Sequence, residues 1–273
     1  MGRTDQLPGA GYYPGYRGGG TSMSTQELRY NNVNELPAET AQALLRFGLA
    51  LADTKHFLGR RLSEWVTAAP AMEASVAAAA ITQDELGHAR SLLAMLRDVT
   101  GAPEELNPET DMSRSTFYAP AALHKSWESW NDVMANMLLL DRALTMIFDA
   151  AARCELAPLR QRVAKIRQEE RFHRIFTEGW VARLAQNERS RAALQQAVAA
   201  HWPVAEAWFG PENEETGTAL VQAGLLAKHP HKLAEAWRQS LEDFLKKHAI
   251  SIPSVNISWD NWRKETRDGG YEN

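Results

Sequence analysis

The chain has 273 residues, of which 44% are hydrophobic and 23% charged, and its formal net charge at pH 7 is -4. This composition is typical of a globular protein with a sizeable core, and it excludes disorder throughout. Nucleic-acid and membrane partners are not expected, because the sequence has neither a basic cluster nor an apolar stretch long enough to cross a bilayer. The single cysteine, Cys154, and the lack of an apolar signal segment predict a cytoplasmic protein.

Both ends of the chain differ in composition from the middle. Residues 1–34 are rich in glycine and tyrosine, so we expect a flexible N-terminal tail that is either disordered or ordered against a partner subunit. Residues 251–273 are expected to form an irregular C-terminal tail. The folded domain is therefore predicted to cover residues 35–250.

Four long runs of apolar residues at helical spacing follow the N-terminal tail. Their lengths and connections predict an all-α fold, a ferritin-like four-helix bundle with extra C-terminal helices. The expected bundle helices cover residues 37–69, 71–100, 121–154 and 159–185, and the shorter ones lie near 189–209 and 231–248.

The pattern Glu-x-x-His occurs once in the second expected helix and once in the fourth, as Glu85 with His88 and Glu170 with His173. Residues three apart share a helix face, so each pair can grip one metal ion from the same side. Both pairs also lie on the apolar face of their helix and should point into the core. Two interpretations are open: a metal site, or a buried polar network without metal.

The other two bundle helices would each add a carboxylate to a di-iron site. Asp141, on the apolar face of the third helix, meets this expectation. The equivalent position in the first helix, about 30 residues before Glu85, is Lys55. The ligand set is therefore one carboxylate short, with a basic residue in its place.

Three neighbouring acids and an imidazole are expected outside this set. Asp53 is rotated by about 200° from Lys55 on an ideal helix, so it is predicted to pair with surface charges. A local bulge that turns Asp53 inward, as the missing ligand, is the alternative. His56 is expected on the surface, and Asp84 and Glu169 are expected to face solvent rather than to orient the histidine rings.

At these residues the sequence resembles the phenylacetic acid catabolic protein family, the ferritin-like subunits of ring 1,2-phenylacetyl-CoA epoxidase. The resemblance covers roughly residues 40–255. The segments that carry it are EWVTAAPAME (64–73), QDELGHAR (83–90), EERFHRIF (169–176), HWPVAEAWFGPEN (201–213) and LAEAWRQSLEDFLKKHAISIP (233–253).

The resemblance implies a complex of two related ferritin-like subunits with a small bridging subunit and a flavin/iron–sulfur reductase. One ferritin-like subunit, the A-type, is catalytic and holds di-iron, and the other, the C-type, is structural. The catalytic ligands carry over onto five positions of this chain, and the sixth falls on Lys55. RRLSEW (60–65) and LAEAW (233–237) resemble the structural subunit. The five positions are Glu85, His88, Asp141, Glu170 and His173.

Two functions follow from the resemblance. The first is a structural subunit of a phenylacetyl-CoA monooxygenase in aerobic phenylacetate degradation, with a degenerate di-iron site in which Lys55 replaces iron. The second is a catalytic subunit that binds one or two iron ions and inserts one oxygen atom into the aromatic ring of an acyl-CoA. An unrelated iron store is a third possibility. The tryptophans after the bundle, among them Trp202, Trp208 and Trp237, are expected to need a partner's surface to cover them.

Overall fold

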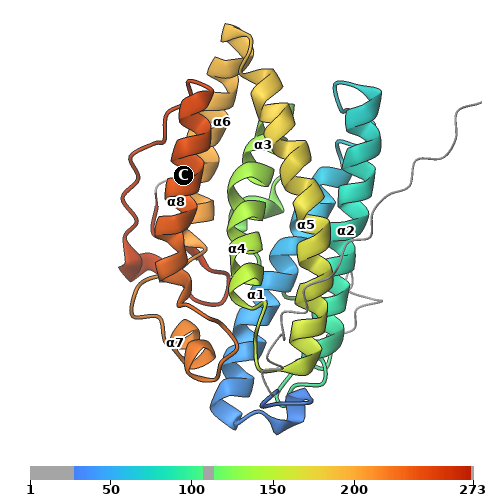
Figure 1. Ribbon diagram of the computed structural model, residues 1–273, viewed down its shortest axis with the longest axis vertical. Coiled ribbons are helices and arrows are strands. Elements are labelled where there is room, and N and C mark those ends of the chain that lie inside the picture. Colours follow the sequence, from blue (N-terminus) through green and yellow to red (C-terminus); the bar gives the residue numbers. More distant parts are fainter. Residues whose placement is uncertain (1–27, 107–113, 272–273) are drawn as a thin grey trace, which may run out of the picture.

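The structure is a computed structural model that describes residues 28–106 and 114–271 (Figure 1). It confirms the all-α fold. The described residues contain one small antiparallel sheet, in which β1 (Trp262–Arg263) pairs with β2 (Asp268–Gly269). Among the helices described, none combines the length and the apolar character needed to span a membrane.

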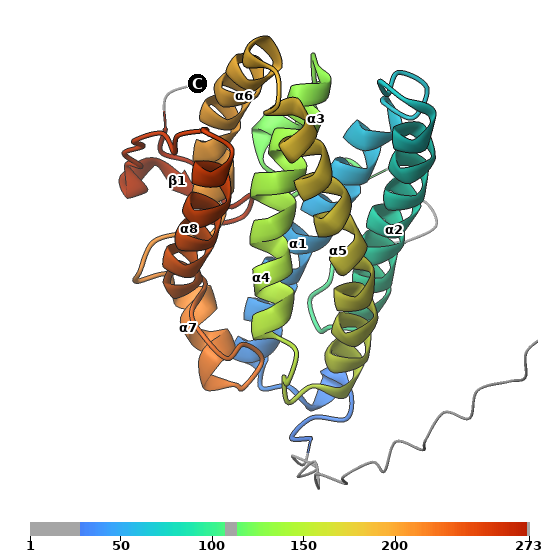
Figure 2. The same cartoon turned by 45° about the horizontal axis from the view of Figure 1, so that its top comes forward.

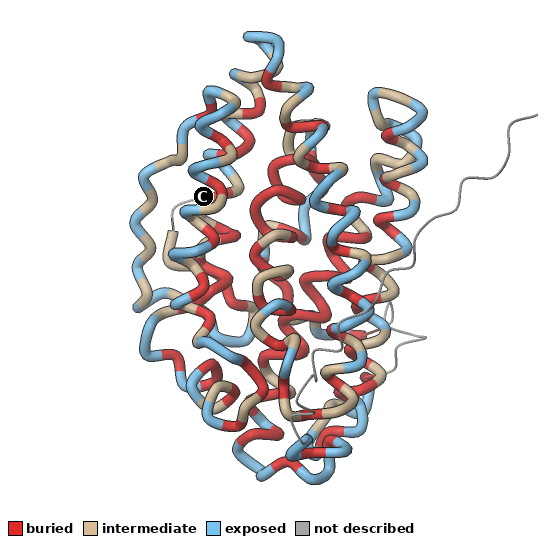
Figure 3. Tube along the Cα trace, viewed as in Figure 1, coloured by how far each residue is buried: buried red, intermediate tan, exposed pale blue. Residues whose placement is uncertain are grey.

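Four helical columns form the ferritin-like bundle, and their inward faces make the core (Figures 2 and 3). The first two columns are a closely packed pair, and the third is a continuous run of α, π and α segments. The columns are α1 (Ala38–Ser63), α2 (Met72–Leu96), the run of α3 (Trp130–Asn136), η4 (Met137–Asp141) and α4 (Arg142–Ala150), and finally α5 (Ala157–Leu184).

The third column begins later than the sequence pattern predicts. Its predicted start at residue 121 is wrong, because Ala121–His124 form a separate 3-10 turn, η3, that ends in extended backbone. The column begins at Trp130, where the side chain of Ser129 accepts a hydrogen bond from the Asp132 backbone N–H. An N-cap of this kind satisfies one of the backbone donors that a helix start leaves free.

The π-helical turn η4 interrupts the third column at the level of Asp141. Short π segments inside α-helices are rare and occur frequently at functional sites. This turn is held from outside the bundle, since the indole of Trp237 donates a hydrogen bond to the Leu139 carbonyl oxygen at 3.0 Å. The last helix of the chain therefore supports the part of the third column that carries Asp141.

Helix α1 is buried on every face between residues 47 and 59. Two glycines let it lie very close to α2: a Cβ on Gly48 would lie 2.7 Å from the side chain of Leu96, and one on Gly59 would lie 3.0 Å from the Cβ of Glu85. On its other side, the crossover between α2 and α3 reaches α1, because the backbone N–H of Tyr118 donates to Asp53 Oδ2 at 2.8 Å. The first column is thus the central element of the fold.

Three further helices follow the bundle. Two of them, α6 and α8, lie beside the third column on the side away from α2, and the sequence did not reveal α7 (Figures 1 and 2). Trp202, Trp208 and Trp237 are completely buried within this chain. The expectation that these three need a partner's surface is therefore wrong. Trp202 and Trp237 pack on each other, with ring centroids 4.6 Å apart, and Trp208 packs on Phe47 of α1. The bounds are α6 (Glu188–Ala207), α7 (Glu215–Gln222) and α8 (Pro230–Lys247).

Both ends of the described chain pack on the bundle. Tyr30 pairs with Leu156 in a parallel bridge at the start of α5, and η1 (Val33–Glu35) follows. Residues 1–27, most of the predicted N-terminal tail, lie outside the described residues. Near the other end, the buried Arg267 donates to the Trp208 and Phe209 carbonyl oxygens.

Arg267 also pairs with the buried carboxylate of Glu214, at 3.5 Å. Glu214 caps α7 by accepting hydrogen bonds from the backbone N–H groups of Thr216 and Gly217. Burial alone would raise the pKa of Glu214, but the charge of Arg267 and these hydrogen bonds outweigh it and lower the pKa below its ordinary value. The C-terminal segment and α7 are thereby joined by one buried ion pair.

Candidate functional site

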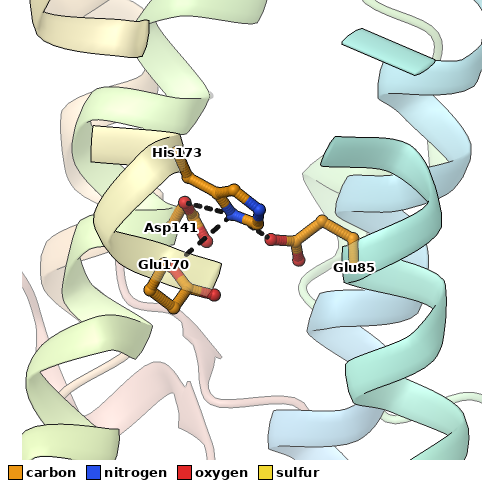
Figure 4. A group of neighbouring side chains, drawn as sticks. All are labelled: Glu85, Asp141, Glu170 and His173. Carbon is orange, nitrogen blue, oxygen red and sulfur yellow. Dashed lines mark ion pairs between the residues drawn. The ribbon is translucent and has the colours of Figure 1, made fainter. Parts of the chain in front are cut away.

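The structure brings all six predicted site residues into one buried cluster at mid-height of the bundle. Each residue is at most 3% exposed. Figure 4 shows Glu85 pointing from α2 toward Asp141, Glu170 and His173 on the opposite columns. One donor atom from each of these four residues lies within 4.8 Å of the others. The contributors are Lys55 from α1, Glu85 and His88 from α2, Asp141 from η4, and Glu170 and His173 from α5.

Helix geometry explains why both Glu-x-x-His pairs point inward. Glu85 lies one turn from the buried Ile81 and His88, and Glu170 lies one turn from the buried Ile166 and His173. Burying these groups without partners would cost several kcal/mol each. The cluster must therefore contain its own counter-charges or a bound cation.

Lys55 supplies a counter-charge from within the chain. Its Nζ lies 2.9 Å from Glu85 Oε1 and also contacts Asp141 Oδ1 and Glu170 Oε1. The three donor positions of an ammonium group are thus each directed at a different carboxylate. Burial by itself would lower the pKa of Lys55, but the charges of the three carboxylates outweigh it and hold the pKa well above its ordinary value. The lysine is charged at neutral pH.

His173 supplies a second positive charge. Its Nδ1 lies 3.1 Å from Glu85 Oε1 and 3.8 Å from Asp141 Oδ2. Burial alone would lower its pKa, but the close carboxylates of Asp141, Glu85 and Glu170 raise the pKa to about 11. Two cations and three carboxylates leave one excess negative charge. Burial raises the pKa of Glu85, against the charge of Lys55, and uptake of one proton there would make the cluster neutral.

Glu170 is stabilised as an anion by its neighbours. Burial would raise its pKa, but the charge of Lys55 and the approach of His88, whose Nδ1 lies 3.4 Å from Glu170 Oε1, outweigh it and place the pKa well below the usual range. Thr145 adds a hydroxyl donor to Glu170 Oε2 at 2.8 Å. Thr145 was not predicted as a site residue from the sequence, although it lies one turn after Asp141 and so shares its helix face.

The two histidines are oriented by acids from the opposite helix. His88 Nε2 lies 2.9 Å from Glu169 Oε2 on α5, and His173 Nε2 lies 3.3 Å from Asp84 Oδ2 on α2. The expectation that Asp84 and Glu169 simply face solvent is wrong, because α2 and α5 pack side by side and place each acid over the other helix's imidazole. Each acid directly precedes its own Glu-x-x-His, and this is the signal from which the two contacts could have been inferred.

The surface positions predicted for Asp53 and His56 are wrong. Asp53 is fully buried and forms an ion pair with Arg114, which is also buried. His56 is buried too, and its ring stacks on Phe117, with the centroids 5.9 Å apart. The helix rotation was estimated correctly, since Asp53 does point away from the cluster. The crossover segment covers that face of α1, so no bulge turns Asp53 toward the carboxylates and it is not a sixth ligand.

The donor atoms have the chemistry of a carboxylate-bridged metal site, with three carboxylates and two imidazoles. The imidazole-to-carboxylate contacts are also those that commonly orient metal ligands. The centre nevertheless does not fit two metal ions. The Lys55 ammonium contacts all three carboxylates that would hold them, so a positive charge already occupies the place of the metal.

Comparison with known proteins identifies the family. The family model described as phenylacetic acid catabolic protein matches residues 23–273. A similar protein is the C subunit of the 1,2-phenylacetyl-CoA epoxidase of Escherichia coli strain K12, which is 26% identical over 211 residues. That alignment covers 77% of this chain and 84% of the relative. The match over nearly the whole length shows that the chain belongs to the phenylacetic acid catabolic protein family.

Proposed function

We propose that this chain is a structural, non-catalytic subunit of a phenylacetyl-CoA 1,2-epoxidase complex. The observation that carries the proposal is the position of Lys55, whose ammonium contacts all three carboxylates of the buried cluster. In this proposal the lysine performs the structural task of a metal, which is to neutralise the acids and to connect the columns. The similarity to the C subunit of an epoxidase supports the assignment to such a complex.

The charges of the cluster favour this function over iron chemistry. Two ferrous ions would add four positive charges beside the ammonium of Lys55, even though a histidine that binds metal is neutral. Three carboxylates cannot balance that total in a buried cavity, where uncompensated charge is costly. Without metal the same groups come within one charge of neutrality.

The proposed partners follow from the same assignment. They are a homologous ferritin-like subunit that holds the di-iron site, a small bridging subunit and a flavin/iron–sulfur reductase, acting together on phenylacetyl-CoA in the cytoplasm. The contribution of this chain would be to bind and position the catalytic subunit. Its core, in which the buried acids are paired within the chain, suits that role.

The second candidate is a catalytic subunit that holds iron itself. It is favoured by the four donor groups within 4.8 Å of one another and by the acids that orient both histidines. For metal to bind, Lys55 would have to lose its proton and leave the three carboxylates. Its raised pKa makes this unfavourable at neutral pH.

Metal analysis of the purified chain, reconstituted anaerobically with ferrous iron, separates the two functions. We expect iron far below one ion per chain, and no oxidation of phenylacetyl-CoA by the chain with a chemical reductant. We expect turnover only when the homologous catalytic subunit and the reductase are added. Stoichiometric iron in the isolated wild-type chain, or turnover by it, would instead establish the catalytic assignment.

A further inference from the structure

A pocket of about 230 Å³ lies between the third column and α5, next to the buried cluster. One wall is the π turn, which contributes the apolar side chains of Met137 and Leu138. Arginines form much of the remainder, from both α4 and α5. They are Arg142, Arg167, Arg171 and Arg174.

The acids in the pocket are already engaged. Asp141 and Glu170 contact Lys55, Glu178 pairs with Arg142 at 3.0 Å, and Asp149 pairs with Arg167. These contacts leave two guanidinium groups without a counter-charge. Within residues 28–106 and 114–271, no carboxylate lies within ion-pair distance of Arg171 or Arg174, and both are exposed.

A further observation indicates that this pocket is suited to a ligand that forms hydrogen bonds. Thr177 lines the pocket, and its buried hydroxyl has no hydrogen-bond partner within the described part of the chain. Buried polar groups are nearly always paired, so an unpaired one calls for an explanation.

We propose that this pocket binds a small organic carboxylate with a short apolar body. The carboxylate would accept hydrogen bonds from Arg171 and Arg174, whose planar forks suit its two oxygens, and from the hydroxyl of Thr177. The apolar body would lie against Met137 and Leu138. The volume suits a ligand much smaller than a coenzyme thioester. The proposal is independent of whether the chain holds metal or assembles with other subunits.

Calorimetric titration of the full-length chain at constant ionic strength tests the proposal, with butyrate, benzoate and inorganic phosphate as probes. We expect butyrate or benzoate to bind at one saturable site, more tightly than phosphate. In the Arg171→Gln/Arg174→Gln variant, the affinity should fall by about tenfold or more, because charged hydrogen bonds are lost. Thr177→Val should weaken binding by about threefold or more.

The matched control is Arg189→Gln on α6, which removes an exposed arginine that has no ion pair within the described residues. It should bind like the wild type, and thermal unfolding should show that all variants are folded. The proposal is overturned if the carboxylates show no saturation at concentrations on the order of 10 mM. It is also overturned if the double variant binds them like the wild type, or if phosphate binds as tightly as they do.

Discussion

Replacing Lys55 by glutamate is the most informative perturbation of the buried cluster. The variant would place a fourth carboxylate among Glu85, Asp141 and Glu170 and remove the ammonium that contacts all three. It would also complete the set of four carboxylates and two histidines found in di-iron bundles. The metal-free protein should therefore lose stability, and the metal-loaded protein should recover it.

The structure allows the magnitude to be estimated. Removing one partner of a buried ion pair costs about 3–5 kcal/mol. In a chain of this size each kcal/mol lowers the melting temperature by about 2–4 °C, so the metal-free variant should melt about 6–20 °C below the wild type. Ferrous iron at about 100 times its Kd should then return about 2.7 kcal/mol, which corresponds to about 5–11 °C.

Thermal unfolding followed by circular dichroism, under anaerobic conditions with and without ferrous iron, measures both effects. The matched control is Lys232→Glu, an exposed lysine in the first turn of α8 that has no ion pair within the described residues. It should change stability by at most about 0.5 kcal/mol and should not respond to iron. Wild-type protein should show no gain with iron.

Two results would refute the reasoning. If Lys55→Glu melts like Lys232→Glu, the lysine does not neutralise the three carboxylates. If the variant is strongly destabilised but iron does not raise its melting temperature, the histidines and acids are not arranged as metal ligands. In that case the resemblance to a di-iron site would be one of residue types alone.

Three further predictions concern the buried groups around the cluster. Asp53→Ala should lower the free energy of unfolding in urea by about 3–5 kcal/mol, because Arg114 loses its buried partner. Like the wild type, the variant should not be stabilised by iron. A loss of stability below about 1 kcal/mol would contradict the buried pair. Trp237→Phe keeps an aromatic ring but loses the hydrogen bond to the π turn, so it should cost about 1 kcal/mol, against about 3–5 kcal/mol for Trp237→Ala. If Trp237→Phe is as stable as the wild type, the hydrogen bond is immaterial. The pKa of Glu214 is lowered in the folded chain, so the stability that its carboxylate contributes is full above about pH 4.3, the ordinary value, and is lost as the pH falls further. In urea titrations, Glu214→Gln should therefore be less stable than the wild type at pH 7, and this difference should shrink toward pH 3. A difference in stability that does not change with pH would exclude the ion pair with Arg267.

The sequence predicted the part of the site that depends on one helix at a time. Glu85 with His88, and Glu170 with His173, lie three residues apart on long helices, so their common inward face follows from the helical period. Lys55 could also be assigned to the site, because it lies on the apolar face of the first helix, about 30 residues before Glu85. These predictions needed no knowledge of how distant segments pack.

The parts that the sequence analysis missed depend on contacts between segments. Asp53 has the spacing of a surface residue on α1, and only the crossover that carries Arg114 buries it. Trp202, Trp208 and Trp237 were likewise assigned to a partner's surface, whereas they are buried within the chain, against one another or against α1. The composition and the helical period of a segment describe that helix alone. They do not show which other segment packs on the face that looks polar.

The exchange of acids between α2 and α5 has a mechanical consequence. His88 is held by Glu169 and His173 by Asp84, so each helix carries one imidazole and the carboxylate that fixes the other helix's imidazole. Sliding the two antiparallel helices by one turn, about 5.4 Å, would break both contacts together. The pair therefore determines the register of the bundle as well as the orientation of the rings. A substitution at Asp84 should be felt first on the opposite helix, and its effect should not be additive with one at Glu169.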